Sequence, residues 1–212
     1  NYIKNYNRDG IPYNQIVVLY RTNAQSQIIE RCFIENQIPY KVVGSYAYFN
    51  RKEVKDLVSY LKLINNQDDD VSLMRIINVP KRGIGEKTIE KLSIKALENN
   101  SSILKVIDNG KELEFKNLIM KSSSKIQNMP FVDIVELVLE ETGIRDEYEK
   151  ENTIEAKSRI ENLEEFKSIA RNFEEYNPGA TLEEFLMEIS LISDVKETYD
   201  DNVVTLMTAH AV

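Results

Sequence analysis

Residues 79–88 have the composition of a phosphate-binding turn. The segment holds three cations and two glycines in close succession: Lys81, Arg82, Gly83, Gly85 and Lys87. Glycines permit a tight turn with positive φ, and a helix beginning directly after the turn offers unpaired N–H groups and a partial positive charge. A phosphate oxygen fits at such a helix start, with the lysine and arginine side chains adding Coulomb attraction from the flanks.

The pattern resembles a helix-hairpin-helix element, which holds the backbone of duplex DNA without reading bases. A plain turn between two helices would also satisfy it. The duplex-binding residues that this pattern predicts are Lys81, Arg82, Gly83, Gly85 and Lys87. A nucleotide-binding P-loop is excluded, because Glu86 interrupts the required Gly-Lys-Thr run and Pro80 stands where the first glycine should be.

A second group of polar residues follows predicted strands. Arg21 and Asn23 come directly after the β-branched run 16–20, while Thr208 and His210 follow the similar run 203–207. If these strands are parallel, all four residues emerge at one sheet edge, where open α/β sheets bind ligands. The pattern predicts one composite site for a phosphate or carboxylate. A helix cap at Asn23 and a histidine without a role are the simpler alternatives.

Several function classes are excluded by composition. The 212 residues include one Cys, one His and no Trp, so no internal disulfide, Cys/His zinc site or Ser-His-Asp triad is expected. We predict no catalytic or metal-binding residue. Neither a signal peptide nor an 18-residue apolar run occurs, so we expect a cytoplasmic protein with no membrane contact.

The elements that position these residues follow from hydrophobic periodicity. The runs 16–20 and 40–43 read as parallel strands joined by a helix between Thr22 and Pro39, and the run 203–207 reads as a third strand that pairs with them. Residues 50–198 show helical apolar stripes throughout. The predicted fold class is mixed α/β and predominantly α-helical, with about 150 helical residues inserted between strands of a small α/β domain.

Charge is distributed unevenly along the chain. The net charge is −8, yet residues 1–66 carry nine Lys/Arg against five Asp/Glu, and residues 71–97 carry six against two. Residues 130–202 hold 21 acidic and seven basic side chains. Phosphate binding is therefore expected in the first half, and the acidic helices read as solvated faces or as a protein-binding surface.

Taken in order, these segments resemble the UvrD/PcrA/Rep-like superfamily 1 DNA helicases, most closely the PcrA type. The resemblance covers nearly the whole chain. The segments that carry it, in chain order, are Val18–Ser26, Gly44–Asp56, Ile76–Gly85, Ser158–Phe166 and Val204–His210.

The resemblance implies an ATP-dependent 3′-to-5′ DNA helicase that acts in repair or replication. It implies that residues 1–48 and 199–212 are parts of a RecA-like 2A domain, and that residues 49–198 are a helical 2B insertion. Arg21, Asn23, Thr208 and His210 would contact single-stranded DNA. The loop of Gly83, Ile84 and Gly85, with its neighbours Arg82 and Thr88, would touch the duplex ahead of the fork. In such an enzyme 2B rotates to switch unwinding on or off.

The resemblance also sets limits. The motifs that bind ATP and Mg²⁺ lie outside this chain, so we expect the chain to be part of a larger enzyme and to bind neither by itself. Replication, repair or transcription proteins are possible partners. Two other interpretations stay open: a protein-interaction module whose acidic helices bind a partner, and part of a helicase-nuclease subunit.

Overall fold

The computed structural model describes residues 2–21, 29–30, 32–33, 35–43, 48–194 and 202–208. The chain divides into two compact units. Residues 1–51 and 188–212 form the sheet unit, and residues 52–187 form the helical unit. Each unit is considered by itself.

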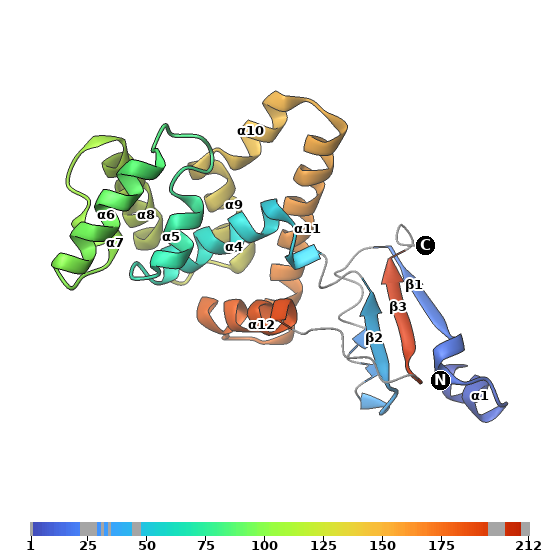
Figure 1. Ribbon diagram of the computed structural model, residues 1–212. Helices are drawn as coiled ribbons and strands as arrows, with labels where there is room; N and C mark the ends of the chain where they lie inside the picture. Colours follow the sequence, from blue (N-terminus) through green and yellow to red (C-terminus); the bar gives the residue numbers. More distant parts are fainter. Residues whose placement is uncertain are drawn as a thin grey trace. The chain divides into compact units, whose positions relative to one another are not determined.

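The sheet unit contains three parallel strands, β1 (Val17–Tyr20), β2 (Tyr40–Val43) and β3 (Val204–Thr208). Their order is β1-β3-β2, so the last strand in sequence lies between the first two (Figure 1). Helix α1 (Tyr2–Arg8) and a 3-10 turn (Tyr13–Gln15) precede β1. The predicted pairing of the last strand with the first two is confirmed, and β3 is the central strand.

Burial explains why β3 is central. Val204 and Leu206 are fully buried and pack with Tyr20, Phe33 and Ile38, because a strand with neighbours on both sides and a covered face needs apolar side chains throughout. Of the helix predicted between Thr22 and Pro39, residues 29–30, 32–33 and 35 are helical, whereas residues 36–39 form a turn and an extended link to β2. Residues 22–28, 31 and 34 lie outside the described residues.

The helical unit holds the longest continuous part of the described chain. Its helices are α4 (Lys52–Asn65), α5 (Asp70–Ile76), α6 (Glu86–Glu98), α7 (Ile103–Val106), α8 (Gly110–Lys125), α9 (Phe131–Thr142), α10 (Ile144–Glu151) and α11 (Ile154–Tyr176). Helix α12 (Leu182–Asp194) begins in this unit and ends in the sheet unit. The prediction of a mixed α/β, predominantly helical chain is confirmed.

Helix α4 forms the centre of the helical unit and packs against α5, α8, α9 and α11. Its stripe of Val54, Leu57, Leu61 and Ile64 is fully buried. Apolar residues three and four positions apart lie on one face of a helix, which is why this stripe was readable from the sequence. No helix in the described part of the chain is long and apolar enough to cross a bilayer.

Candidate nucleic-acid interface

The hairpin, residues 77–85 between α5 and α6, contains two glycines that have different roles. Gly83 adopts a φ of +71°, a left-handed conformation that glycine tolerates best. Gly85 has a φ of −86° and is the N-cap of α6, so its backbone does not require glycine. The expectation that both glycines serve positive φ is therefore wrong for Gly85.

Asn78 ties the two sides of the hairpin together. Its Oδ1 accepts hydrogen bonds from the backbone N–H groups of Arg82 (2.7 Å) and Ile84 (3.3 Å). The Ile84 side chain is 2% exposed and packs inward. Both interactions fix the shape of the turn, so Ile84 supports the hairpin from inside.

The Arg82 guanidinium is directed into the protein. Nη1 donates to the carbonyl oxygen of Ile76, the last residue of α5 (3.3 Å). It also donates to the carbonyl oxygens of Val79 (2.9 Å) and Pro80 (3.2 Å), which lie just beyond that helix. These carbonyls lie at the negative end of the α5 dipole, where a cation is favourable. Arg82 thus closes the end of α5.

The same guanidinium joins three further helices to the hairpin. Nη2 donates to the Tyr60 hydroxyl of α4 (2.8 Å) and to the Thr142 carbonyl at the end of α9 (3.4 Å). The guanidinium carbon lies 5.3 Å from the centre of the Phe115 ring of α8, within cation–π range. The sequence placed Arg82 among the duplex contacts; the structure gives its side chain this internal use.

Tyr60 completes the network from the core. Its side chain is fully buried, and its hydroxyl donates to the Val79 carbonyl (2.5 Å) while accepting from Arg82. Burial raises the pKa of Tyr60 to about 12, and the neighbouring Arg82 acts in the opposite direction. The phenol therefore stays neutral at physiological pH and remains a hydrogen-bond donor.

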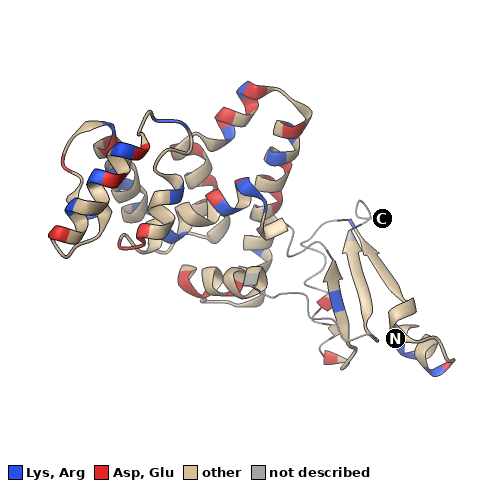
Figure 2. Cartoon of the chain, in the orientation of Figure 1, with Lys and Arg blue, Asp and Glu red and all other residues tan. Residues whose placement is uncertain are grey.

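The outer side of the hairpin carries the groups that remain for a ligand. Lys81 and Lys87 are exposed, and no carboxylate among the described residues pairs with either. The N–H groups of Gly85, Glu86 and Lys87 at the start of α6 likewise meet no acceptor within the described chain. Figure 2 shows the Lys and Arg colour on this loop and on α6.

Several other lysines of the helical unit pair with carboxylates, whereas the hairpin combines unpaired lysines with unpaired N–H groups. Lys95 binds Asp108 (2.5 Å), and both Lys121 and Lys125 bind Glu141 (2.9 and 2.7 Å). An unpaired cation beside unpaired N–H groups is an arrangement that can receive an anion.

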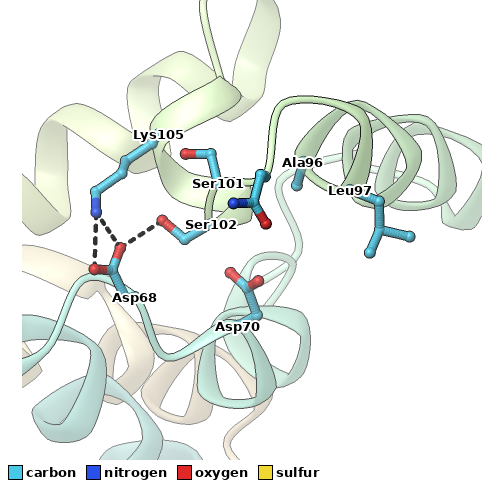
Figure 3. Close-up of a pocket in the computed structure, with 8 residues that line it drawn as sticks. Asp68, Asp70, Ala96, Leu97, Ser101, Ser102 and Lys105 are labelled. Carbon is cyan, nitrogen blue, oxygen red and sulfur yellow. Dashed lines mark hydrogen bonds and ion pairs between the residues drawn. The ribbon is translucent and has the colours of Figure 1, made fainter.

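An acidic hollow on the same unit lies between the start of α5, the end of α6 and α7 (Figure 3). It has a volume of about 420 Å³. Asp68 accepts from the Ser102 hydroxyl (2.6 Å) and pairs with Lys105 (2.6 Å), while Asp70 accepts from the N–H of Ile103 (2.8 Å). Hydrogen bonds from Lys105 and Ser102 lower the pKa of Asp68. These carboxylates hold α7 against α5.

The structure describes part of the sheet edge at which the sequence predicts a single-stranded DNA site. Tyr20 and Thr208 are register partners of parallel strands, so Arg21, which follows Tyr20, emerges beside the end of β3. The expected common edge is therefore confirmed for Arg21 and for the backbone of Thr208. Asn23 and His210 lie outside the described residues.

Of the aromatic residues at positions 46–49, the structure describes Tyr48 and Phe49, and neither offers an exposed ring face to a base. Tyr48 is fully buried and Phe49 is 7% exposed, with the rings in edge-to-face contact at 5.1 Å. Arg51 lies over the Tyr48 ring at 5.4 Å. These residues pack against each other.

The described residues do not fit ATP with its magnesium ion. No group of three or more His, Cys, Asp or Glu side chains is placed to hold a metal ion within the described ranges. The P-loop-like segment also places the Glu86 carboxylate at the first position of α6.

Comparison with known proteins shows which family this chain belongs to. Residues 1–212 match the family described as the UvrD-like helicase C-terminal domain. The chain belongs to this family. Among curated relatives, an ATP-dependent DNA helicase PcrA of Staphylococcus epidermidis is 42% identical over 99% of this chain, and one of Staphylococcus aureus is 40% identical over the same share. The chain spans about 30% of the length of these relatives.

Sequence reasoning missed the supporting residues of this UvrD-like domain. Nothing in the spacing of Tyr60 distinguishes it from the other members of the α4 stripe, and Thr142 contributes only a backbone carbonyl. Asn78 carried a weak signal, since asparagine side chains commonly hydrogen-bond the backbone of a following turn.

Proposed function

We propose that this chain is part of an ATP-dependent 3′-to-5′ DNA helicase, in which the helical unit is the 2B domain and grips duplex DNA through the hairpin. Family membership and the names of the two staphylococcal relatives support the helicase assignment. The observation that carries the duplex role is the pair of exposed, unpaired lysines beside the free N–H groups of α6.

The grip acts on the phosphate backbone. A phosphate oxygen accepts hydrogen bonds from the N–H groups of Gly85, Glu86 and Lys87, and the ammonium groups of Lys81 and Lys87 neutralise its charge. No base edge is read, so binding is independent of sequence, as an enzyme that unwinds any duplex requires. The direct contacts comprise Lys81, Gly83, Gly85, Lys87 and Thr88, and Arg82 and Ile84 hold the turn from inside.

The sheet unit serves the other DNA substrate. In this proposal it is part of the 2A domain, and Arg21, Asn23, Thr208 and His210 bind single-stranded DNA at the carboxyl edge of the sheet. ATP binding and hydrolysis belong to segments other than this chain and move the 2A domain along the strand. The orientation of 2B regulates unwinding.

Binding of duplex DNA by the chain tests the proposal. The probe is a labelled duplex with a 3′ single-stranded tail, read by fluorescence anisotropy over a series of salt concentrations. Each phosphate contact contributes about 0.9 to the slope of log K against log[salt]. We expect Lys81→Gln with Lys87→Gln to reduce that slope by about 2 and to weaken binding.

A matched control removes the same charge elsewhere. Lys121→Gln with Lys125→Gln deletes two cations that pair with Glu141, and it leaves the hairpin intact. The proposal predicts a salt slope near that of the wild type for this variant. Equal slopes for both double variants would show that the hairpin lysines do not contact phosphate.

The wild-type result separates the two main interpretations. Salt-dependent binding that the hairpin variant loses supports the helicase role. A folded chain that ignores the duplex at low salt would instead favour a protein-interaction module, with replication, repair or transcription proteins as partners of the acidic helices.

A further inference from the structure

The start of α8 brings a third lysine to the hairpin. The Lys111 Nζ lies 2.8 Å from the position that a Cβ on Gly83 would occupy, and the Cδ and Cε of Lys111 lie within 4 Å of it. The two residues are 28 positions apart in sequence. The ammonium group therefore covers the turn at the residue that has no side chain.

Helix geometry fixes this placement. Lys111 and Phe115 are four residues apart on α8 and share one face of the helix. Phe115 is 1% exposed and packs under the Arg82 guanidinium, so the face it shares with Lys111 is held toward the hairpin. Lys111, one turn earlier, extends along that face to Gly83.

Lys111 is available for a ligand. Its side chain is exposed, and it makes no ion pair or hydrogen bond with any residue that the structure describes. The nearby acidic groups are engaged elsewhere: Asp108 pairs with Lys95, and the Glu112 carboxylate folds back toward Gly110, with its Oε2 at 2.7 Å from the position of a Cβ there. Glu86, at the start of α6, remains the acidic group on the hairpin itself.

We infer that Lys111 is a further phosphate-binding residue of the duplex grip, supplied by α8 rather than by the hairpin motif. The inference rests on the proposed function of the hairpin, and it assigns the ligand as a phosphodiester of the duplex backbone. Lys81 and Lys87 approach the phosphate from the two ends of the turn, and Lys111 approaches across Gly83. Glycine at position 83 thus serves both the positive φ and the space above the turn.

The test compares single lysine substitutions on one helix. Lys111→Gln should weaken duplex binding and lower the slope of log K against log[salt] by about 0.9. Lys121→Gln removes the same charge from the same helix but from an ion pair with Glu141, and it should leave the slope unchanged. Lys111→Arg keeps the positive charge, so its slope should stay at the wild-type value. Thermal unfolding of each variant verifies that the fold is retained.

The outcomes separate this inference from the proposed function. If Lys111→Gln behaves as Lys121→Gln while the Lys81/Lys87 double variant loses affinity, Lys111 is not a contact and the hairpin grip stands. If the double variant also binds as tightly as the wild type, the duplex grip itself is refuted, and Lys111 with it.

Discussion

Two helix junctions of the helical unit use charged groups in opposite ways. At the acidic hollow, Asp68 and Asp70 bind partners on and just before α7, so each of these carboxylates has an internal use. At the hairpin, Arg82 alone is turned inward, while Lys81 and Lys87 remain exposed. Both segments are charged loops beside a helix end, yet only the hairpin has charges left for a ligand.

The difference lies in what satisfies the helix ends. Backbone carbonyls and a neutral phenol serve as the acceptors for Arg82, so the hairpin is stabilised without a carboxylate that pairs with its lysines among the described residues. The hollow is stabilised by carboxylates, which attract the nearby cation Lys105 and leave no positive charge free. A junction built on carbonyl acceptors can therefore be rigid and still attract an anion.

The largest effect is expected at the inward arginine. Arg82→Ala should lower the free energy of unfolding by about 2–4 kcal/mol, because it leaves buried carbonyls and the Tyr60 hydroxyl without their donor. Denaturant unfolding measures the change. Lys81→Ala, the neighbouring exposed cation, should change stability by less than about 0.5 kcal/mol. Equal small effects for both would mean that Arg82 does not hold the hairpin.

A smaller effect should distinguish the two glycines. Gly83→Ala forces a side chain onto a φ of +71° and should cost about 1 kcal/mol, while the flexible end of Lys111 moves aside. Gly85→Ala has an ordinary φ and no atom within 4 Å of the new Cβ, so it should stay within about 0.5 kcal/mol of the wild type. A larger loss at Gly85 than at Gly83 would contradict this geometry.

The smallest effect is a difference in pH response. The pKa of Asp68 is lowered, so its contribution is present above the usual aspartate range and is lost as pH falls through the lowered value. The Tyr60 pKa is raised to about 12, so its contribution is complete below about 10 and is lost as pH rises through 12. When the pH is lowered toward about 3, amide hydrogen exchange should therefore speed up at residues 102–106 at a higher pH than at residues 78–84. If exchange speeds up first at residues 78–84, carboxylates do not stabilise the hollow in preference to the hairpin.

The sequence predicted the helices and strands better than it predicted the contacts that hold the hairpin in place. Short β-branched runs located the three strands of the described residues, and the α4 stripe located the core helix, since both patterns are local in the sequence. The hairpin was recognisable because glycines and cations are adjacent in the chain. The inward turn of Arg82 was not, because it depends on Tyr60, Phe115 and Thr142, which lie 22, 33 and 60 residues away in the sequence. Only the fold brings such partners together.

We propose that the helical unit meets duplex DNA at the hairpin and not at the hollow. Titration of the ¹⁵N-labelled chain with a blunt duplex, followed by amide chemical shifts, distinguishes the two surfaces. We expect the largest shifts at the amides of Gly83, Gly85, Glu86 and Lys87, with small shifts at Ser102 and Ile103. Shifts centred on the hollow, or an unchanged hairpin at saturating duplex, would contradict it.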